Sequence, residues 1–150
     1  MIIAVDIGTR QLGWSLFTNG EYYRSGVLKS SKINWVENIE RIYYKLKIVI
    51  EKYNIDTFIF EKPEFWMYGK GITGATSGSI VKLSVSLGAF LSIVFNQANK
   101  KIILIEAKKW KGQLPKRVTM KRINKIIKKD IKNDNESDAI GIGLFHLGRF

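Results

Sequence analysis

The chain has 150 residues, no cysteine and a formal net charge of +12. This length suits one domain with its own hydrophobic core, and the absence of cysteine excludes disulfides and thiolate metal sites. The N-terminus lacks the basic segment of a signal peptide, and the longest uncharged stretch, residues 83–99, is shorter than a membrane span usually needs. We therefore expect a single cytoplasmic domain over residues 1–150, without membrane association.

The positive charge is concentrated in one part of the sequence. Residues 100–132, called the basic segment below, contain 13 of the 25 lysines and arginines against only Glu106 and Asp130. Lysines scattered evenly over a surface would indicate little beyond solubility. A concentrated patch favours a polyanionic partner, most often a nucleic acid.

The first predicted strand ends in a carboxylate. Residues 1–5 are apolar and rich in β-branched types, Asp6 follows them, and Gly8 comes two positions later. A run that is apolar on both faces is typical of a strand in the middle of a sheet. A charge at the end of such a strand is costly unless hydrogen bonds or a cation compensate it. The alternative is that Asp6 only opens a turn.

The following residues predict a meander of three antiparallel strands. Residues 12–17 and 21–28 have the pattern of strands, and Asn19-Gly20 between them is typical of a tight hairpin turn. Short turns leave consecutive strands next to one another, so the first three strands are expected to pair in chain order.

A crossover connection is predicted next. Residues 33–53 carry an apolar stripe at helical spacing, with Asn34 as the predicted N-cap, and residues 56–61 form another buried strand. A long helix between two strands is typical of a connection to a parallel neighbour. Because neighbouring strands lie about 5 Å apart, Asp6 and Glu61 at their ends are close enough to share a metal ion.

Two segments after Glu61 have more than one interpretation. The glycine-rich loop 63–78 contains Phe65 and Trp66, which either stack on unpaired bases or cap the core. Residues 79–95 predict a helix that is apolar nearly all round. Such a helix is buried or forms an interface, and a 150-residue domain has little room to bury it. Packing against a second copy of the chain is therefore our hypothesis.

The basic segment predicts a strand over residues 101–105 and a helix over 116–132. Lysines surround Trp110 between them, and the outer face of the helix is cationic. Binding of phosphates by this face should weaken steeply with salt, because counterions are released on binding. The residues predicted to point inward from this helix are Val118, Ile123, Ile126, Ile127 and Ile131.

A final helix is predicted from Asp134 to Leu147. Acids in its first turn are explained by favourable placement at a helix N-terminus. Asp138 is explained poorly in that way, because it lies one turn further in and shares a face with Ile142. An acid directed at the sheet needs compensation, and a metal ion shared with Asp6 and Glu61 supplies it.

The order of these elements resembles the RuvC family of Holliday junction resolvases, within the RNase H-like fold. The resemblance covers essentially the whole chain. It implies an α/β fold with a five-stranded mixed sheet, three antiparallel strands then two parallel, flanked by helices. It is carried by Val5-Asp6-Ile7-Gly8-Thr9-Arg10 with Gly13, Phe60-Glu61, Lys82-Leu83 with Leu87-Gly88, and Ser137-Asp138-Ala139-Ile140-Gly141.

The resemblance also implies a set of catalytic residues. Asp6, Glu61 and Asp138 match the metal-binding acids of the family. A fourth ligand, usually Asp or His, is expected three residues before the last Asp. Asn135 occupies that place here, with Asp134 or Glu136 as possible substitutes.

Basic and aromatic residues are expected to contact DNA. The resemblance places Lys121 roughly where the family has a basic residue near the scissile phosphate, and Phe65, alone or with Trp66, as the loop aromatic. The DNA-contacting set predicted from these features is Arg10, Phe65, Trp66, Lys70, Lys108, Lys109, Lys111, Lys116, Arg117, Lys121 and Arg122.

The implied activity is Mg²⁺-dependent endonucleolytic cleavage of four-way junctions or other branched DNA. Carboxylates suit hard cations, Mn²⁺ being a substitute, and two ions per site are expected. Paired symmetric nicks require two sites, so a homodimer through residues 79–95 is expected. The small, lysine-rich chain suggests a phage or low-GC bacterial member, acting in the cytoplasm of the bacterium or the host cell.

Three other functions remain open at this point. Asp6 to Gly13 also resembles the YqgF branch of the same fold, which would act on structured RNA. Asp-x-Gly-Thr also begins the phosphate hairpin of sugar- and acetate-kinase-like ATPases, although 150 residues leave no room for their second domain. The third alternative is a non-catalytic basic module that binds nucleic acid and whose acids only cap helices.

Overall fold

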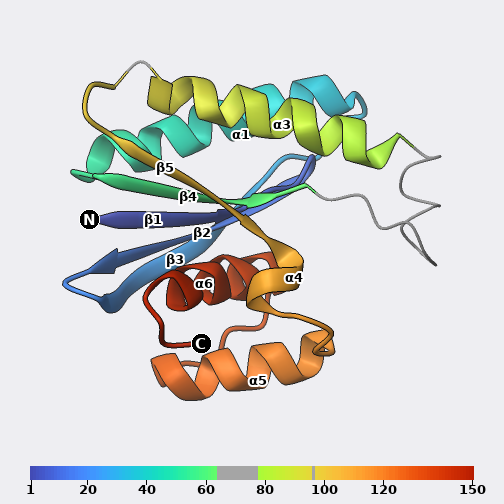
Figure 1. The fold of residues 1–150 in the computed structure, drawn as a ribbon. Coiled ribbons are helices and arrows are strands. Elements are labelled where there is room, and N and C mark those ends of the chain that lie inside the picture. The colour runs from blue at the N-terminus through green and yellow to red at the C-terminus, as the bar shows by residue number, and fades with distance from the viewer. Residues whose placement is uncertain (64–77, 96) are drawn as a thin grey trace.

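The computed structural model describes residues 1–63, 78–95 and 97–150. Five strands form one sheet in the order β3-β2-β1-β4-β5 (Figure 1). The pairs β1–β2 and β2–β3 are antiparallel, whereas β1–β4 and β4–β5 are parallel. The predicted mixed sheet is therefore confirmed. Its strands are β1 (Ile2–Asp6), β2 (Gln11–Thr18), β3 (Glu21–Lys29), β4 (Thr57–Lys62) and β5 (Lys101–Glu106).

Helices cover both faces of this sheet. Two helices lie on one face, and α6 lies on the other with α5 packed against it (Figure 1). The first helix is α1 (Trp35–Lys52), and the side chain of Asn34 accepts a hydrogen bond from the backbone N–H of Val36, as expected of its N-cap. The other helices are α3 (Ser79–Phe95), α4 (Ala107–Trp110), α5 (Lys116–Ile127) and α6 (Asp134–His146).

The prediction for the basic helix was wrong at its C-terminal end. α5 ends at Ile127 instead of continuing to residue 132, because Lys128 adopts a left-handed conformation with φ of 55°. The side chain of Asn124 then accepts a hydrogen bond from the backbone N–H of Ile131 and closes the following turn. The inward position predicted for Val118 is also wrong, since its neighbour Thr119 is buried in its place.

Strand alternation separates two cores. Ile3, Val5 and Phe60 face α1 and α3, whereas Ala4 and Ile59 face α6. Because side chains alternate along a strand, Asp6 and Glu61 share the face of Ala4 and Ile59 and are directed to the α6 side of the sheet.

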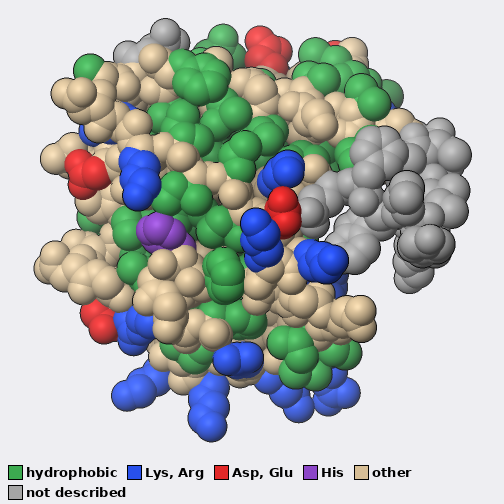
Figure 2. Space-filling view, viewed as in Figure 1, with side chains coloured by type: hydrophobic (Ala, Val, Ile, Leu, Met, Phe, Trp, Pro, Cys, Tyr) green, Lys and Arg blue, Asp and Glu red, His purple; other side chains and the backbone are tan. Residues whose placement is uncertain are grey.

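Within the described ranges, no helix has the length and hydropathy needed to cross a membrane. Lysine and arginine side chains project along the edge of the molecule where α5 lies (Figure 2).

Candidate metal centre and nucleic-acid interface

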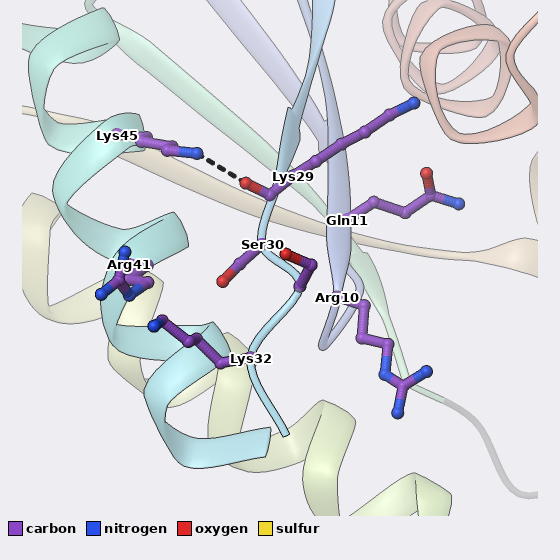
Figure 3. Close-up of a pocket in the computed structure, with 8 residues that line it drawn as sticks. Arg10, Gln11, Lys29, Ser30, Lys32, Arg41 and Lys45 are labelled. Carbon is purple, nitrogen blue, oxygen red and sulfur yellow. Dashed lines mark hydrogen bonds between the residues drawn. The ribbon is translucent and has the colours of Figure 1, made fainter. Parts of the chain in front are cut away.

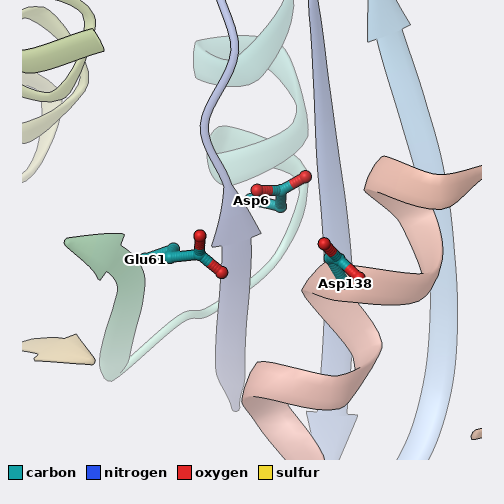
Figure 4. A group of neighbouring side chains, drawn as sticks. All are labelled: Asp6, Glu61 and Asp138. Carbon is teal, nitrogen blue, oxygen red and sulfur yellow. The ribbon is translucent and has the colours of Figure 1, made fainter. Parts of the chain in front are cut away.

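Three carboxylates from distant parts of the chain converge at one end of the sheet. Asp6 is the last residue of β1, Glu61 lies near the end of the parallel strand β4, and Asp138 lies in the second turn of α6. Each contributes an oxygen atom to a group whose members all lie within 4.8 Å of one another (Figure 4). The interpretation of Asp6 as only a turn former does not account for this arrangement.

Small side chains on β2 bring α6 close to the sheet. A Cβ atom at Gly13 would overlap the backbone carbonyl of Asn135 and lie 2.8 Å from the backbone nitrogen of Glu136. Two residues further along the same face, the Ser15 hydroxyl donates a hydrogen bond to the carbonyl oxygen of Ala139 at 2.9 Å. The first turns of α6, which carry Asp138, are therefore held directly against β2.

The pKa values of two acids in the cluster are raised. Burial raises the pKa of Asp6 well above its usual value, and the nearby carboxylates of Glu61 and Asp138 raise it further. Burial also raises the pKa of Glu61, although Lys111 opposes the effect. Asp6 and Asp138 are each only 9% exposed. Bringing three ionised acids together at such a place is unfavourable unless a positive charge accompanies them.

Lys111 supplies one positive charge at the cluster. Its Nζ lies 2.9 Å from an Oδ atom of Asp138 and 3.7 Å from an Oε atom of Glu61. Burial acts to lower the pKa of Lys111, but Glu61 and Asp138 outweigh burial, so the pKa is raised and the side chain stays protonated. The sequence places Lys111 among the DNA contacts and gives no sign of this role.

Trp110 is the second residue whose role the sequence does not reveal. Its indole Nε1 donates a 3.0 Å hydrogen bond to Glu61, and its ring is almost completely buried. The short helix α4, which the sequence does not predict, turns the chain after β5 so that Trp110 and Lys111 both reach the acids. The adjacent Trp and Lys in the basic segment are the only signal that was present.

The candidates for a fourth ligand lie in different environments. The side chain of Asn135 is within hydrogen-bonding reach of Asp6. Asp134 is half-exposed and pairs with Lys116 at 3.3 Å, and Glu136 accepts a 2.6 Å hydrogen bond from the hydroxyl of Ser25. Neither substitute belongs to the acidic group found among the described residues.

The predicted DNA-contacting residues are spread around the cluster. Arg10 follows β1, and Lys108 and Lys109 are exposed on α4. The predicted residues of α5, Lys116, Arg117, Lys121 and Arg122, are all exposed, and Lys125 is a further exposed cation of this helix. The cation in contact with the acids is Lys111, not Lys121. Phe65, Trp66 and Lys70 lie outside the described residues.

Comparison with known proteins places this arrangement in a structural class. No protein-family model and no curated protein sequence matches the chain. Thermus thermophilus RuvC in complex with a Holliday junction substrate superposes with a TM-score of 0.73 at 16% identity, covering 99% of this chain and 96% of that one. The fold is RNase H-like.

Two further solved structures agree with this fold. A second Thermus thermophilus RuvC structure has a TM-score of 0.73 at 19% identity, covering 97% of this chain and 92% of that one. Fowlpox virus resolvase, solved with Holliday junction DNA, has a TM-score of 0.54 at 19% identity and full coverage of both chains.

The donor set of the cluster suits a hard divalent cation. All three groups are carboxylates, which Mg²⁺ and Mn²⁺ prefer, and neither thiolate nor imidazole belongs to this group of described residues. Burial is the main cause of the raised pKa values of Asp6 and Glu61, and the nearby Lys111 charge does not cancel its effect. The residues therefore fit a metal centre.

Proposed function

We propose that this protein is a metal-dependent endonuclease that cuts branched DNA, with the four-way junction as its main substrate. The observation that carries this proposal is the convergence of Asp6, Glu61 and Asp138 at one end of an RNase H-like sheet. Two of the similar structures were solved with Holliday junction DNA, which supports the choice of substrate.

In this proposal, Asp6, Glu61 and Asp138 hold the metal. When bound, a pair of Mg²⁺ or Mn²⁺ ions activates water and stabilises charge on the leaving oxygen of a phosphodiester. Asn135 orients the carboxylate of Asp6 through its amide. A neutral amide stands where the RuvC family usually has Asp or His, so a ligand at this position would be the carbonyl oxygen of Asn135.

Lys111 and the basic surface act on the DNA. The Lys111 ammonium lies at the acids and stays protonated, which places a fixed positive charge where a scissile phosphate would approach. Around it, Lys108, Lys109 and the exposed lysines and arginines of α5 neutralise backbone phosphates. This division assigns cutting to the buried cluster and affinity to the exposed cations.

A homodimer completes the proposal. Val81 and Val85 on α3 are 60% and 48% exposed, and a pocket of about 250 Å³ between α1 and α3 is lined by Tyr43, Tyr44 and aliphatic side chains, with Glu40 among them. Paired nicks on two strands require two sites related by a two-fold axis. We propose that this α1–α3 surface contacts a second copy of the chain.

The decisive experiment is cleavage of a synthetic mobile four-way junction with and without Mg²⁺. Asp6→Asn and Asp138→Asn should reduce cutting to the level seen without metal, because each removes a charged ligand, while junction binding survives. Asp134→Asn is the matched control, since this exposed acid on the same helix lies outside the cluster.

Two outcomes would contradict the proposal. Near wild-type cutting by Asp138→Asn would exclude the cluster as the metal centre. Cleavage of structured RNA with no cleavage of branched DNA would exclude the substrate but retain the metal centre.

The dimer is tested by sedimentation at micromolar concentration. Val85→Glu should dissociate the dimer, because a charge would be buried at the contact. Val118→Glu on α5 is the control, since Val118 is 47% exposed and so resembles Val85. A wild-type chain that sediments as a monomer would remove this part of the proposal.

A further inference from the structure

A second concentration of positive charge lies beside the sheet, away from the basic segment. It forms a pocket of about 420 Å³ between the end of β3, the loop after β1 and the middle of α1 (Figure 3). We call it the β3–α1 pocket. Its basic lining residues are Arg10, Lys29, Lys32, Arg41 and Lys45.

No acid in the described part of the chain compensates the charges of this pocket. No acidic residue lines it, and no ion pair in residues 1–63, 78–95 and 97–150 involves Arg10, Lys29, Lys32, Arg41 or Lys45. Lys45 instead donates a hydrogen bond to the backbone carbonyl of Lys29 at 2.6 Å. Cations gathered without partners repel one another, so an anion in the pocket is favoured electrostatically.

The backbone around the pocket is held in place. The backbone N–H of Ser30 donates to the carbonyl oxygen of Arg10 at 2.9 Å. The buried amide of Asn38 bonds both the N–H and the carbonyl of Lys32, at 2.8 and 2.9 Å. These hydrogen bonds connect the chain after β3 to the loop after β1 and to α1. The backbone from which the basic side chains extend is therefore fixed.

Ser30 provides an independent sign of a missing partner. Its hydroxyl oxygen is buried and has no hydrogen-bond partner among the described residues, although Ser30 lines the pocket. Leaving a buried polar group unsatisfied is unfavourable. An anion in the pocket would give this hydroxyl an acceptor after rotation about its side-chain bond.

The pocket is connected to the acidic cluster. Arg10 and Gln11 also line a second pocket of about 340 Å³, together with Gly8, Lys82 and Asn135. Asn135 in turn lies within hydrogen-bonding reach of Asp6. Because β1 and β3 are both antiparallel to β2, the ends of β1 and β3 lie at the same end of the sheet. A basic path therefore leads from the metal centre to the β3–α1 pocket.

We propose that the β3–α1 pocket binds backbone phosphates of the nucleic-acid substrate at a distance from the scissile bond. This inference rests on the proposed function, since it needs a substrate held at the acidic cluster. The lining favours phosphates over bases because it contains five basic residues and no aromatic ring. The pocket thus fixes the register of the substrate while the basic segment holds it elsewhere.

The first test compares two double variants in α1 and its N-terminal loop. Lys32→Gln/Arg41→Gln removes two pocket charges, whereas Lys47→Gln/Lys52→Gln removes two charges of α1 that do not line the pocket. We expect the pocket variant to bind a four-way junction more weakly in EDTA and to reduce the salt slope by about 2, because each phosphate contact contributes about 1. The control variant should keep the wild-type slope.

The second test locates the phosphates. Junctions are made with a single neutral methylphosphonate at each position in turn, and binding is measured with wild type and with the pocket variant. We expect positions away from the cut site at which the neutral linkage weakens wild-type binding but not binding of the variant. Equal sensitivity of both proteins at every position, with equal salt slopes, would overturn the inference.

These results remain separable from the proposed function. If the pocket does not bind phosphates, Mg²⁺-dependent cutting by wild type and its dependence on Asp138 remain unchanged. Loss of the proposed function shows as absence of cutting by wild type itself, whatever the pocket variant does to binding.

Discussion

The two faces of the sheet are built by the same strands but carry different residues. On the face toward α1 and α3, β1 and β4 present Ile3, Val5, Phe58 and Phe60, all fully buried and apolar. On the face toward α6, the same strands begin with apolar residues such as Ala4 and Ile59 and end in carboxylates. One face serves only packing, and the other combines packing with a charged centre.

This difference shows how the acids are kept together against their repulsion. Packing along the apolar part of α6 fixes its position, since Ile140, Ile142 and Leu144 are buried against the sheet side. The N-terminal turns of α6 then have no freedom to move Asp138 away from Asp6. The comparison predicts that changes on the α1–α3 face alter stability alone, whereas changes near the acids alter metal binding as well.

The largest effect on stability is expected from Leu46→Ala. Leu46 is fully buried in the core under α1, and truncation of a buried leucine costs about 2–5 kcal/mol in lost burial and cavity formation. Urea unfolding should show this loss, and calorimetry of the folded variant should show unchanged Mg²⁺ affinity. Weaker Mg²⁺ binding by the folded variant would contradict the expectation that changes on the α1–α3 face alter stability alone.

The next effect is expected from Gly13→Ala. The new Cβ would overlap the backbone of Asn135, so α6 must shift, at a cost of about 1–3 kcal/mol. Because the shifted turn carries Asp138, Mg²⁺ affinity should fall together with stability. Gly88→Ala in α3 is the control, since a Cβ there meets nothing and alanine should stabilise the helix by about 0.5–1 kcal/mol.

A gain in stability is expected from Asp6→Asn in EDTA. The raised pKa of Asp6 means that the folded state binds its proton more tightly than the unfolded state. Stability therefore falls as pH rises from about 4, the unfolded pKa, through the folded pKa. Replacing the acid removes this loss at neutral pH, so Tm should rise, and each kcal/mol gained corresponds to about 2–4 °C in a chain of this size.

Calorimetric scans at several pH values check this expectation. The Tm difference between Asp6→Asn and wild type in EDTA should be smallest near pH 4 and grow toward pH 7. Added Mg²⁺ should raise the Tm of wild type and leave the variant nearly unchanged, because only a cation that binds the folded state stabilises it. A variant that is less stable than wild type at pH 7 would contradict the raised pKa.

The smallest effect on stability is expected for the difference between Trp110→Phe and a control Trp→Phe change. Both changes shrink a buried ring, but Trp110→Phe also removes the hydrogen bond to Glu61, worth about 0.5–1.5 kcal/mol, and leaves the carboxylate paired with Lys111 at 3.7 Å. Mg²⁺ affinity should fall by about tenfold, as for other residues that orient a ligand. Trp14→Phe on the opposite face is the control, since the buried Nε1 of Trp14 has no partner to lose.

Much of the fold was predictable because it depends on local pattern. The runs around Ile3, Ile59 and Ile103 predicted buried strands, and the helical stripe ending near Tyr53 predicted the crossover that makes β1 and β4 parallel. Parallel neighbours place Asp6 and Glu61 at one end of the sheet, and the position of Asp138 among apolar residues indicated that it faces them. The convergence of the three acids could therefore be predicted from the sequence.

The positions of Trp110 and Lys111 and the β3–α1 pocket were decided by tertiary structure. Gly141 shows the reason, because a side chain there would occupy the space in which the Trp110 ring packs on α6. Contact between α4 and α6 depends on this fit between residues 31 positions apart, and Lys111 reaches Asp138 only as a consequence. The periodicity of hydrophobic residues shows which face of a helix or strand is buried. It does not show which side chains of different elements fit together, because that depends on their shapes in the folded protein.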